Sequence, residues 1–335
     1  MKSHTVPKKL LENFAYDDPV THSKRLWRYQ KGRRPFGEAA PRTATRWDGH
    51  FADPANSVKE AELEERLKRE FEDPVNQFID MVGCTTFPWT ATQIRLLTGY
   101  MTILFHRTRA RRTMSDIQKR IMLEALRALR SNDDRLSQLV AKQTMDPING
   151  GHLPPQVFTK EQVVEAIDRE IAKHTNIDEA QRLYIQTMET MMAFSDENML
   201  KGRWDIIHTE PNRPFVIGDA PVVTWERTEN NVRVYGQGFA RPNVEVFLPV
   251  CPTACIHVSP LVERTRRVRT PVTEEVNKAQ AAFATEHCFT NLCSLDIDAT
   301  LQPEFGKVPL GVSGFSVEHI DFNKALFDIL MGQRS

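Results

Sequence analysis

Residues 215–222 read Phe-Val-Ile-Gly-Asp-Ala-Pro-Val, and they indicate a buried strand that ends in a turn. Consecutive apolar residues are typical of a strand covered on both faces, and the Gly, Asp and Pro that follow are typical of a turn. Further β-rich runs separated by Gly and Pro flank this stretch, at 204–208, 232–235, 244–250 and 254–258. We therefore expect a sheet from residue 204 onward, followed by one late helix over 273–287.

The start of the chain carries a second apolar segment. His4-Thr5-Val6-Pro7 is followed by Leu11 and Phe14. A loose terminal tail would not need such apolar anchors, so we expect this segment to be buried against the 204–258 sheet. The run 26–29 then alternates apolar and polar residues, and Lys31-Gly32-Arg33-Arg34 supplies a turn before Phe36, which predicts a small hairpin.

Between residues 57 and 203 the apolar residues recur with the period of a helix. One such stripe consists of Leu63, Leu67, Phe71, Phe78 and Val82. Asp73-Pro74 interrupts it, and because proline is favoured in the first turn of a helix, we expect a kink or two helices there. Thr90 is a predicted N-cap, and Thr159 with Gln162 forms a predicted capping box.

The order of these patterns predicts an α+β fold. A discontinuous β-rich domain is formed by both ends of the chain, with a large central all-α region. We expect residues 1–56 to form an N-terminal segment and hairpin that pack on the C-terminal sheet. Residues 57–203 are the helical region, and residues 204–335 are a β-rich region with a late helix.

Composition limits the classes of function. The chain has 335 residues, of which 40% are hydrophobic, and its 44 basic side chains balance 44 acidic ones. With no net charge, any recognition of an anion must be local. Five cysteines without a CxxC pair favour reduced thiols. We find neither an apolar signal segment nor a stretch long enough to span a bilayer, so we expect a cytoplasmic protein without membrane contact.

Asp219 and His4 are the candidate catalytic residues. A carboxylate at a strand end could bind a divalent metal ion, act as a base, or orient a histidine. In the structural alternative Asp219 accepts hydrogen bonds from backbone N–H groups two residues further on, in an Asx-turn. A terminal histidine could be a base or a ligand, or it could only pin the N-terminal segment by a hydrogen bond.

Arginines follow the predicted helix over 91–107. Positive charge in the last turn of a helix is favourable against the helix dipole, which is the structural explanation. Arginine forks also suit phosphate groups, so Arg107 and Arg109 are candidate substrate-binding residues for a nucleotide or nucleic acid. The sequence contains no Gly-x4-Gly-Lys-Ser/Thr, Gly-x-Gly-x-x-Gly, His-Glu-x-x-His or Gly-x-Ser-x-Gly motif. P-loop, dinucleotide-binding, zincin and α/β-hydrolase chemistry therefore have no support.

The two end signatures together resemble the domain of unknown function 4238 family. That family opens with His-x-Val-Pro-Gln-x-x-Leu-x-x-Phe, which His4, Val6, Pro7, Leu11 and Phe14 match, although Lys8 stands where Gln is usual. Its Phe-Ile-Thr-Ser-Asp-x-Pro-Val is similar to residues 215–222. Val276-Asn277 falls in the expected order at the start of the late helix. The resemblance implies a fold and a site, in which we expect Asn277 to be a substrate-binding residue, but no established activity.

Two functions are consistent with these patterns. The first is a hydrolase acting on a phosphate-containing substrate such as nucleic acid, with His4 and Asp219 opening on one cleft. The second is a non-catalytic binding or regulatory module in which His4 and Asp219 are structural staples. The sequence specifies neither the cofactor nor the oligomeric state.

Overall fold

Strands from the two ends of the sequence pair in one antiparallel sheet. In the computed structural model, β3 (Lys24–Gln30) lies beside β12 (His287–Thr290), with Tyr29 opposite Cys288. The short strand β7 (Ile217–Gly218) pairs with the other edge of β12. The protein is thus an α+β protein whose β-rich part is formed by both ends of the chain, as expected.

The structure describes most but not all of the chain. The described residues are 2–34, 36–48, 57–82, 89–108, 123–143, 159–175, 197–227, 233–236, 238–239, 243–260 and 273–308. The chain divides into two compact units. The first comprises Met1–Arg112 and Tyr184–Leu310, and the second comprises Thr113–Leu183 and Gly311–Ser335.

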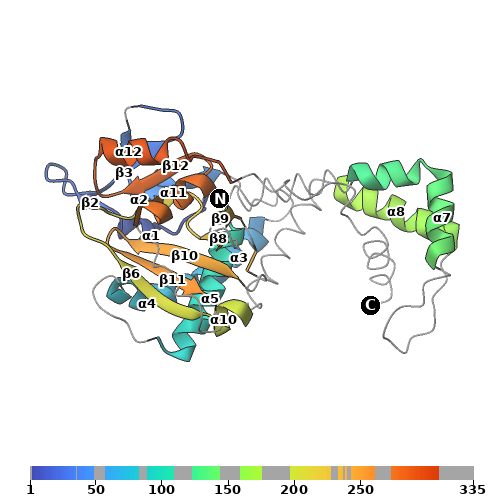
Figure 1. Ribbon diagram of the computed structural model, residues 1–335, viewed down its shortest axis with the longest axis horizontal. Helices are drawn as coiled ribbons and strands as arrows, with labels where there is room; N and C mark the ends of the chain where they lie inside the picture. The colour runs from blue at the N-terminus through green and yellow to red at the C-terminus, as the bar shows by residue number, and fades with distance from the viewer. Residues whose placement is uncertain are drawn as a thin grey trace. The chain divides into compact units, whose positions relative to one another are not determined.

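The described residues of the first unit form three antiparallel sheets, and most strands of the two larger ones are labelled in Figure 1. One has the order β2-β3-β12-β7, with β4 on β3, and its remaining strands are β2 (Tyr16–Asp17) and β4 (Gly37–Ala39). The second has the order β6-β11-β10-β8-β9, formed by β6 (Arg203–His208), β11 (Ala254–Ser259), β10 (Val244–Cys251), β8 (Val223–Arg227) and β9 (Arg233–Tyr235). The third pairs β1 (Lys2–His4) with β5 (Arg46–Asp48).

Every described element between residues 57 and 201 is a helix. Those in the first unit are α3 (Ser57–Leu67), the π-helix η1 (Lys68–Glu72), α4 (Asp73–Val82), α5 (Ala91–His106) and α10 (Glu197–Lys201). The second unit contains the helical residues 123–130, α7 (Asp133–Gln143) and α8 (Lys160–Thr175). The domain boundaries expected from the sequence at residues 56 and 203 stay a prediction.

Local sequence chemistry explains where several helices begin. Pro74 lies in the first turn of α4, where its missing N–H costs nothing, and the π-helix η1 separates α4 from α3. The two helices expected at this point are therefore present. Thr90 caps α5 through a capping box with Gln93, whose N–H donates to the Thr90 hydroxyl. Thr159 and Gln162 form the second expected capping box, at the start of α8.

The N-terminal segment is part of the main core, as expected. Val6, Leu11 and Phe14 are completely buried in the same apolar cluster as residues of β10. The side-chain amide of Asn13, just after α1 (Lys8–Glu12), donates to the backbone carbonyl of Val250 at 3.3 Å. A short helix, α2 (Pro41–Ala44), follows the hairpin and contacts α1. The start of the chain is therefore fixed to the second sheet.

Two further helices come from the end of the described chain, α11 (Thr273–Phe283) and α12 (Leu295–Leu301). Helix α11 contacts β7 and β12 of one sheet and β8 of the other, so it lies between the two five-stranded sheets. Its last residue is Phe283 and not residue 287 as expected, because the chain turns at 284–286 and enters β12. This turn and the first turn of α11 position the candidate site.

Candidate functional site

The carboxylate of Asp219 holds a turn from a distant part of the chain. It lies directly after β7 and accepts three backbone hydrogen bonds, from Thr285 at 2.7 Å, Glu286 at 2.9 Å and His287 at 3.1 Å. Its own N–H donates to the carbonyl of His287. The expected Asx-turn, with donors two residues further on, is therefore replaced by donors from the turn between α11 and β12. Asp219 joins two chain segments that are remote in sequence.

Two opposing effects act on the protonation of Asp219. Burial raises its pKa to about 6, because an ionised carboxylate loses hydration in this partly buried position. The three amide donors lower the pKa, since they favour the charged form, but they do not cancel the effect of burial. At neutral pH the group is ionised, and it becomes protonated in mild acid.

Two amide side chains of α11 bind the backbone that leads to Asp219. Asn277 accepts from the N–H of Val216 and donates to the carbonyl of Pro214, both at 2.9 Å. One turn later, Gln280 accepts from the N–H of Gly218 and donates to Pro221, both at 2.8 Å. The side chains of α11 thus bind backbone groups that a neighbouring strand would otherwise bind. For this reason the strand β7 is only Ile217–Gly218, whereas residues 215–217 were expected to be strand.

Glycine is required at position 218 because the backbone of α11 lies very close to it. A Cβ atom at this position would lie 3.0 Å from the backbone oxygen of Gln280. Sequence reasoning identified Asn277 but missed Gln280. The signal for Gln280 was its spacing of three residues from Asn277, which places both amides on one face of the helix.

Arg107, a predicted substrate-binding residue, is paired inside the protein. It is 3% exposed, and its guanidinium donates to Glu64 at 2.7 Å and to Glu72 at 2.8 Å. These two carboxylates come from α3 and η1, so the pairing connects the end of α5 to the preceding helices. Phosphate binding by Arg107 stays a prediction that would require it to leave these partners. Arg109, predicted with it, lies outside the described residues.

His4 and Asp219 belong to different sheets. His4 is the last residue of β1, and its backbone lies opposite Arg46 of β5. Asp219 follows β7 of the sheet that contains β3 and β12. The side chain of His4 lies outside the described part of the structure, so the expected cleft that His4 and Asp219 share stays a prediction.

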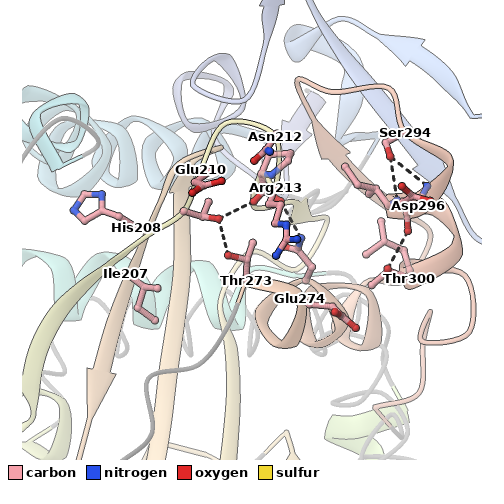
Figure 2. A pocket seen from close by; sticks show the side chains of 15 residues that line it. Ile207, His208, Glu210, Asn212, Arg213, Thr273, Glu274, Ser294, Asp296 and Thr300 are labelled. Carbon is pink, nitrogen blue, oxygen red and sulfur yellow. Dashed lines mark hydrogen bonds between the residues drawn. The ribbon is translucent and has the colours of Figure 1, made fainter.

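A pocket of about 870 Å³ opens beside this region (Figure 2). Its wall comes from the end of β6 with the connection that follows it, the first two turns of α11, and α12. Figure 2 shows Asp296 and Thr300 of α12 across the pocket from Arg213 and Thr273. The lining residues are Ile207, His208, Thr209, Glu210, Asn212, Arg213, Pro214, Thr273, Glu274, Asn277, Ser294, Asp296, Ile297, Thr300 and Leu301.

Hydroxyl groups hold the wall of the pocket together. Thr209 donates to the carbonyl of Arg213 and accepts from the hydroxyl of Thr273, both at 2.8 Å, which ties the connection to α11. The hydroxyl of Ser294 caps α12 by accepting from the N–H groups of Asp296 and Ile297. The wall is therefore preformed.

Charged side chains of both signs line the pocket. Three of the lining residues are acidic, Glu210, Glu274 and Asp296, and Arg213 supplies the single guanidinium among them. Glu274 is partly neutralised by Lys278, whose ammonium lies 2.6 Å from its carboxylate. Of the predicted site residues whose side chains the structure describes, only Asn277 lines this pocket, and both of its polar atoms are already bonded to backbone. The other lining residues gave no sequence signal, because they meet only through the fold.

The described residues set limits on metal and thiol chemistry. Within them, no group of three or more His, Cys, Asp or Glu could hold a metal ion. The described cysteines are free thiols, and Cys255 and Cys288 are buried. Among the described helices, none is sufficiently long and apolar to cross a membrane.

One family of sequences matches this chain over most of its length. The sequence model described as a protein of unknown function (DUF4238) matches residues 2–291. Comparison with curated proteins and with solved structures gave no match.

Proposed function

We propose that this chain, which belongs to the DUF4238 family, is a non-catalytic binding module. In this proposal the pocket between α11 and α12 holds a small polar ligand, and the motif around Asp219 is a structural staple for one wall of that pocket.

The observation that carries the proposal is the bonding of Asp219. A general base or a metal ligand must direct an oxygen lone pair toward its target. The two oxygens of Asp219 already accept three backbone N–H groups, and Asp219 is not among the residues that line the pocket. The same bonds fix the turn from which β12 begins. These bonds support a role in positioning and not in chemistry.

The lining of the pocket favours a ligand that carries hydroxyl or amine groups. Its volume is within the range of about 300 to 1,000 Å³ that is usual for sites of small molecules. Glu210 and Asp296 would attract an amine or accept from hydroxyls, whereas they would repel a phosphate brought near Arg213. Arg213 can donate to a hydroxyl or carbonyl oxygen of the same ligand.

The proposal can be tested by thermal shift on the full chain. In a panel of amino sugars, polyols, polyamines and nucleotides, members of the first three classes should raise the melting temperature and the nucleotides should not, because the acidic lining repels their phosphates. A ligand at 100 times its Kd stabilises by about 2.7 kcal/mol. Arg213→Ala and Asp296→Asn should abolish the shift, whereas Arg203→Ala should not, because Arg203 is an exposed arginine outside the pocket.

The competing hydrolase function predicts a different result. In that case nucleotides or nucleic acid are turned over, and both His4→Ala and Asp219→Asn abolish turnover. This outcome, or a thermal shift that survives both pocket variants, would overturn the binding proposal.

A further inference from the structure

The strand β3 and the turn after it are strongly basic. Residues 24–34 contain two lysines and four arginines, and no acidic residue occurs between Asp18 and Glu38. The chain as a whole has no net charge, so this segment is a local concentration of positive charge. It lies in the sheet of β2, β3, β4 and β12 and does not contribute to the pocket.

Most of these cations have no partner within the protein. Arg34 pairs with the buried carboxylate of Asp298 at 2.6 Å. The side chains of the other five make no hydrogen bond or ion pair within the part of the chain that the structure describes; these residues are Lys24, Arg25, Arg28, Lys31 and Arg33. Elsewhere in this unit exposed cations are commonly paired, as Lys201 is with Glu197 and Arg203 with Asp205. Unpaired cations are therefore concentrated in this segment.

Aromatic rings lie among the unpaired cations. Tyr16 stands opposite Arg25 in the pairing of β2 with β3, and its ring is stacked on that of Trp27 at 5.9 Å. Phe36 meets Trp27 edge-on at 6.1 Å, just beyond the basic turn. All three rings are partly exposed. Rings and cations thus alternate along one short stretch of chain.

We infer that this segment, residues 24–34 together with Tyr16 and Phe36, is a binding surface for single-stranded nucleic acid. The unpaired lysines and arginines would contact successive phosphates, and the partly exposed rings would contact unstacked bases. Gly32, which has a positive φ of 68°, allows the tight turn that presents Lys31 and Arg33 at the end of the hairpin.

Charge and shape together favour a single strand over other polyanions. Stacking on a side chain requires bases that are not already stacked in a duplex. An anionic membrane would need apolar side chains to insert beside the cations. Two of the large hydrophobic residues exposed on the described chain lie near this sheet, Val20 in the loop between β2 and β3 and Leu295 at the start of α12, and each is a single side chain. A nucleic acid therefore fits both the charges and the rings.

The test is binding of fluorescein-labelled U20 and dT20 to the full chain, followed by anisotropy over a range of salt concentrations. Lys31→Glu combined with Arg33→Glu should weaken binding about tenfold or more and reduce the slope of log Kd against log salt by about 1 to 2. Lys201→Glu combined with Arg203→Glu changes the net charge equally but lies outside the segment. This control should change Kd by less than about twofold.

A ligand-side control tests the rings without changing the protein. An abasic phosphodiester of the same length should bind about fivefold or more weakly than dT20, since it has no bases to stack. Equal binding of the abasic strand, tighter binding of a duplex, or equal weakening by the two double variants would overturn the inference. Binding to phosphatidylserine vesicles without binding to either oligonucleotide would also overturn it.

Discussion

Replacing Asp219 by asparagine should lower the free energy of unfolding in mild acid, but not at neutral pH. The carboxylate accepts three backbone N–H groups, and a protonated carboxyl group can keep all three, because both of its oxygens retain lone pairs. An asparagine cannot, because its amide nitrogen has no acceptor. At least one buried N–H, such as that of Thr285, is then left without a partner, at a cost of about 1 to 3 kcal/mol.

The pH dependence follows from the raised pKa. Asp219 has a pKa of about 6 in the folded protein against 3.8 ordinarily, so the folded state binds its proton more tightly. The stability due to this difference is fully present below pH 4 and is lost as the pH rises through 6. The loss amounts to about 3 kcal/mol. The asparagine side chain does not ionise, so the variant does not lose this stability as the pH rises. The substitution should therefore lower the free energy of unfolding by about 1 to 3 kcal/mol at pH 4, and this difference from the wild type should vanish or reverse at pH 7.5.

Urea unfolding at pH 4 and pH 7.5, followed by tryptophan fluorescence, measures both values. All five tryptophans belong to the unit that contains Asp219, so the signal reports on that unit; they are Trp27, Trp47, Trp89, Trp204 and Trp225. A cost below about 0.5 kcal/mol at pH 4 would refute the role of Asp219 as a staple. A cost that is equal at both pH values, or larger at pH 7.5, would show that burial does not dominate its pKa.

Asp18→Asn is a matched control, because its effect on stability should depend on pH in the opposite direction. Asp18 accepts from the hydroxyl of Thr21 at 2.6 Å and from the N–H of Val20 at 2.9 Å in an exposed turn. The hydrogen bond from Thr21 lowers the pKa of Asp18. Its contribution to stability is therefore present above the ordinary pKa and lost as the pH falls. The cost of Asp18→Asn should therefore be similar at pH 7.5 and pH 4, and it should decrease only below pH 3.8.

Three further predictions concern stability and can be checked by the same unfolding measurements. Arg107→Met should cost about 3 to 5 kcal/mol, because it leaves the carboxylates of Glu64 and Glu72 near each other without their cation; a cost near zero would free Arg107 for a role in binding. Gln280→Ala should cost about 1 to 3 kcal/mol through the lost acceptor for Gly218, whereas an exposed change on α11 should stay within about 0.5 kcal/mol. Deleting residues 1–14 should cost about 5 kcal/mol or more, since several fully buried apolar side chains are lost, and an unchanged melting temperature would contradict this.

Features that depend on neighbouring residues could be predicted from the sequence. Thr90 and Thr159 cap helices through residues three positions away, and Pro74 ends one helical segment through its own missing N–H. The burial of Phe14 followed from its apolar neighbours. In each case the physical cause lies within one or two turns of chain, so the pattern in the sequence is sufficient.

Features that depend on distant residues could not be predicted in the same way. The position of Asp219 at a strand end was read correctly, but its donors are more than 60 residues further on, and no local rule selects them. The length of β7 was overestimated because Asn277 takes the N–H of Val216 that a strand would have used. The pocket was missed because its three walls are brought together only by the packing of α11 and α12.

The pairing of β3 with β12 has a consequence during synthesis on the ribosome. Leu26 and Tyr29 of β3 leave the exit tunnel early, but their strand partner is translated only when His287–Thr290 has been added. At ordinary rates of translation this interval lasts roughly ten seconds to a minute. During that time β3 can pair with β2 and β4, but the edge that β12 will occupy is unpaired and Leu26 and Tyr29 are not yet covered, and an unpaired edge promotes association between chains. A chaperone that covers residues 24–30 until release would therefore be expected to raise the yield of folded protein, and chains that stop before residue 287 should aggregate.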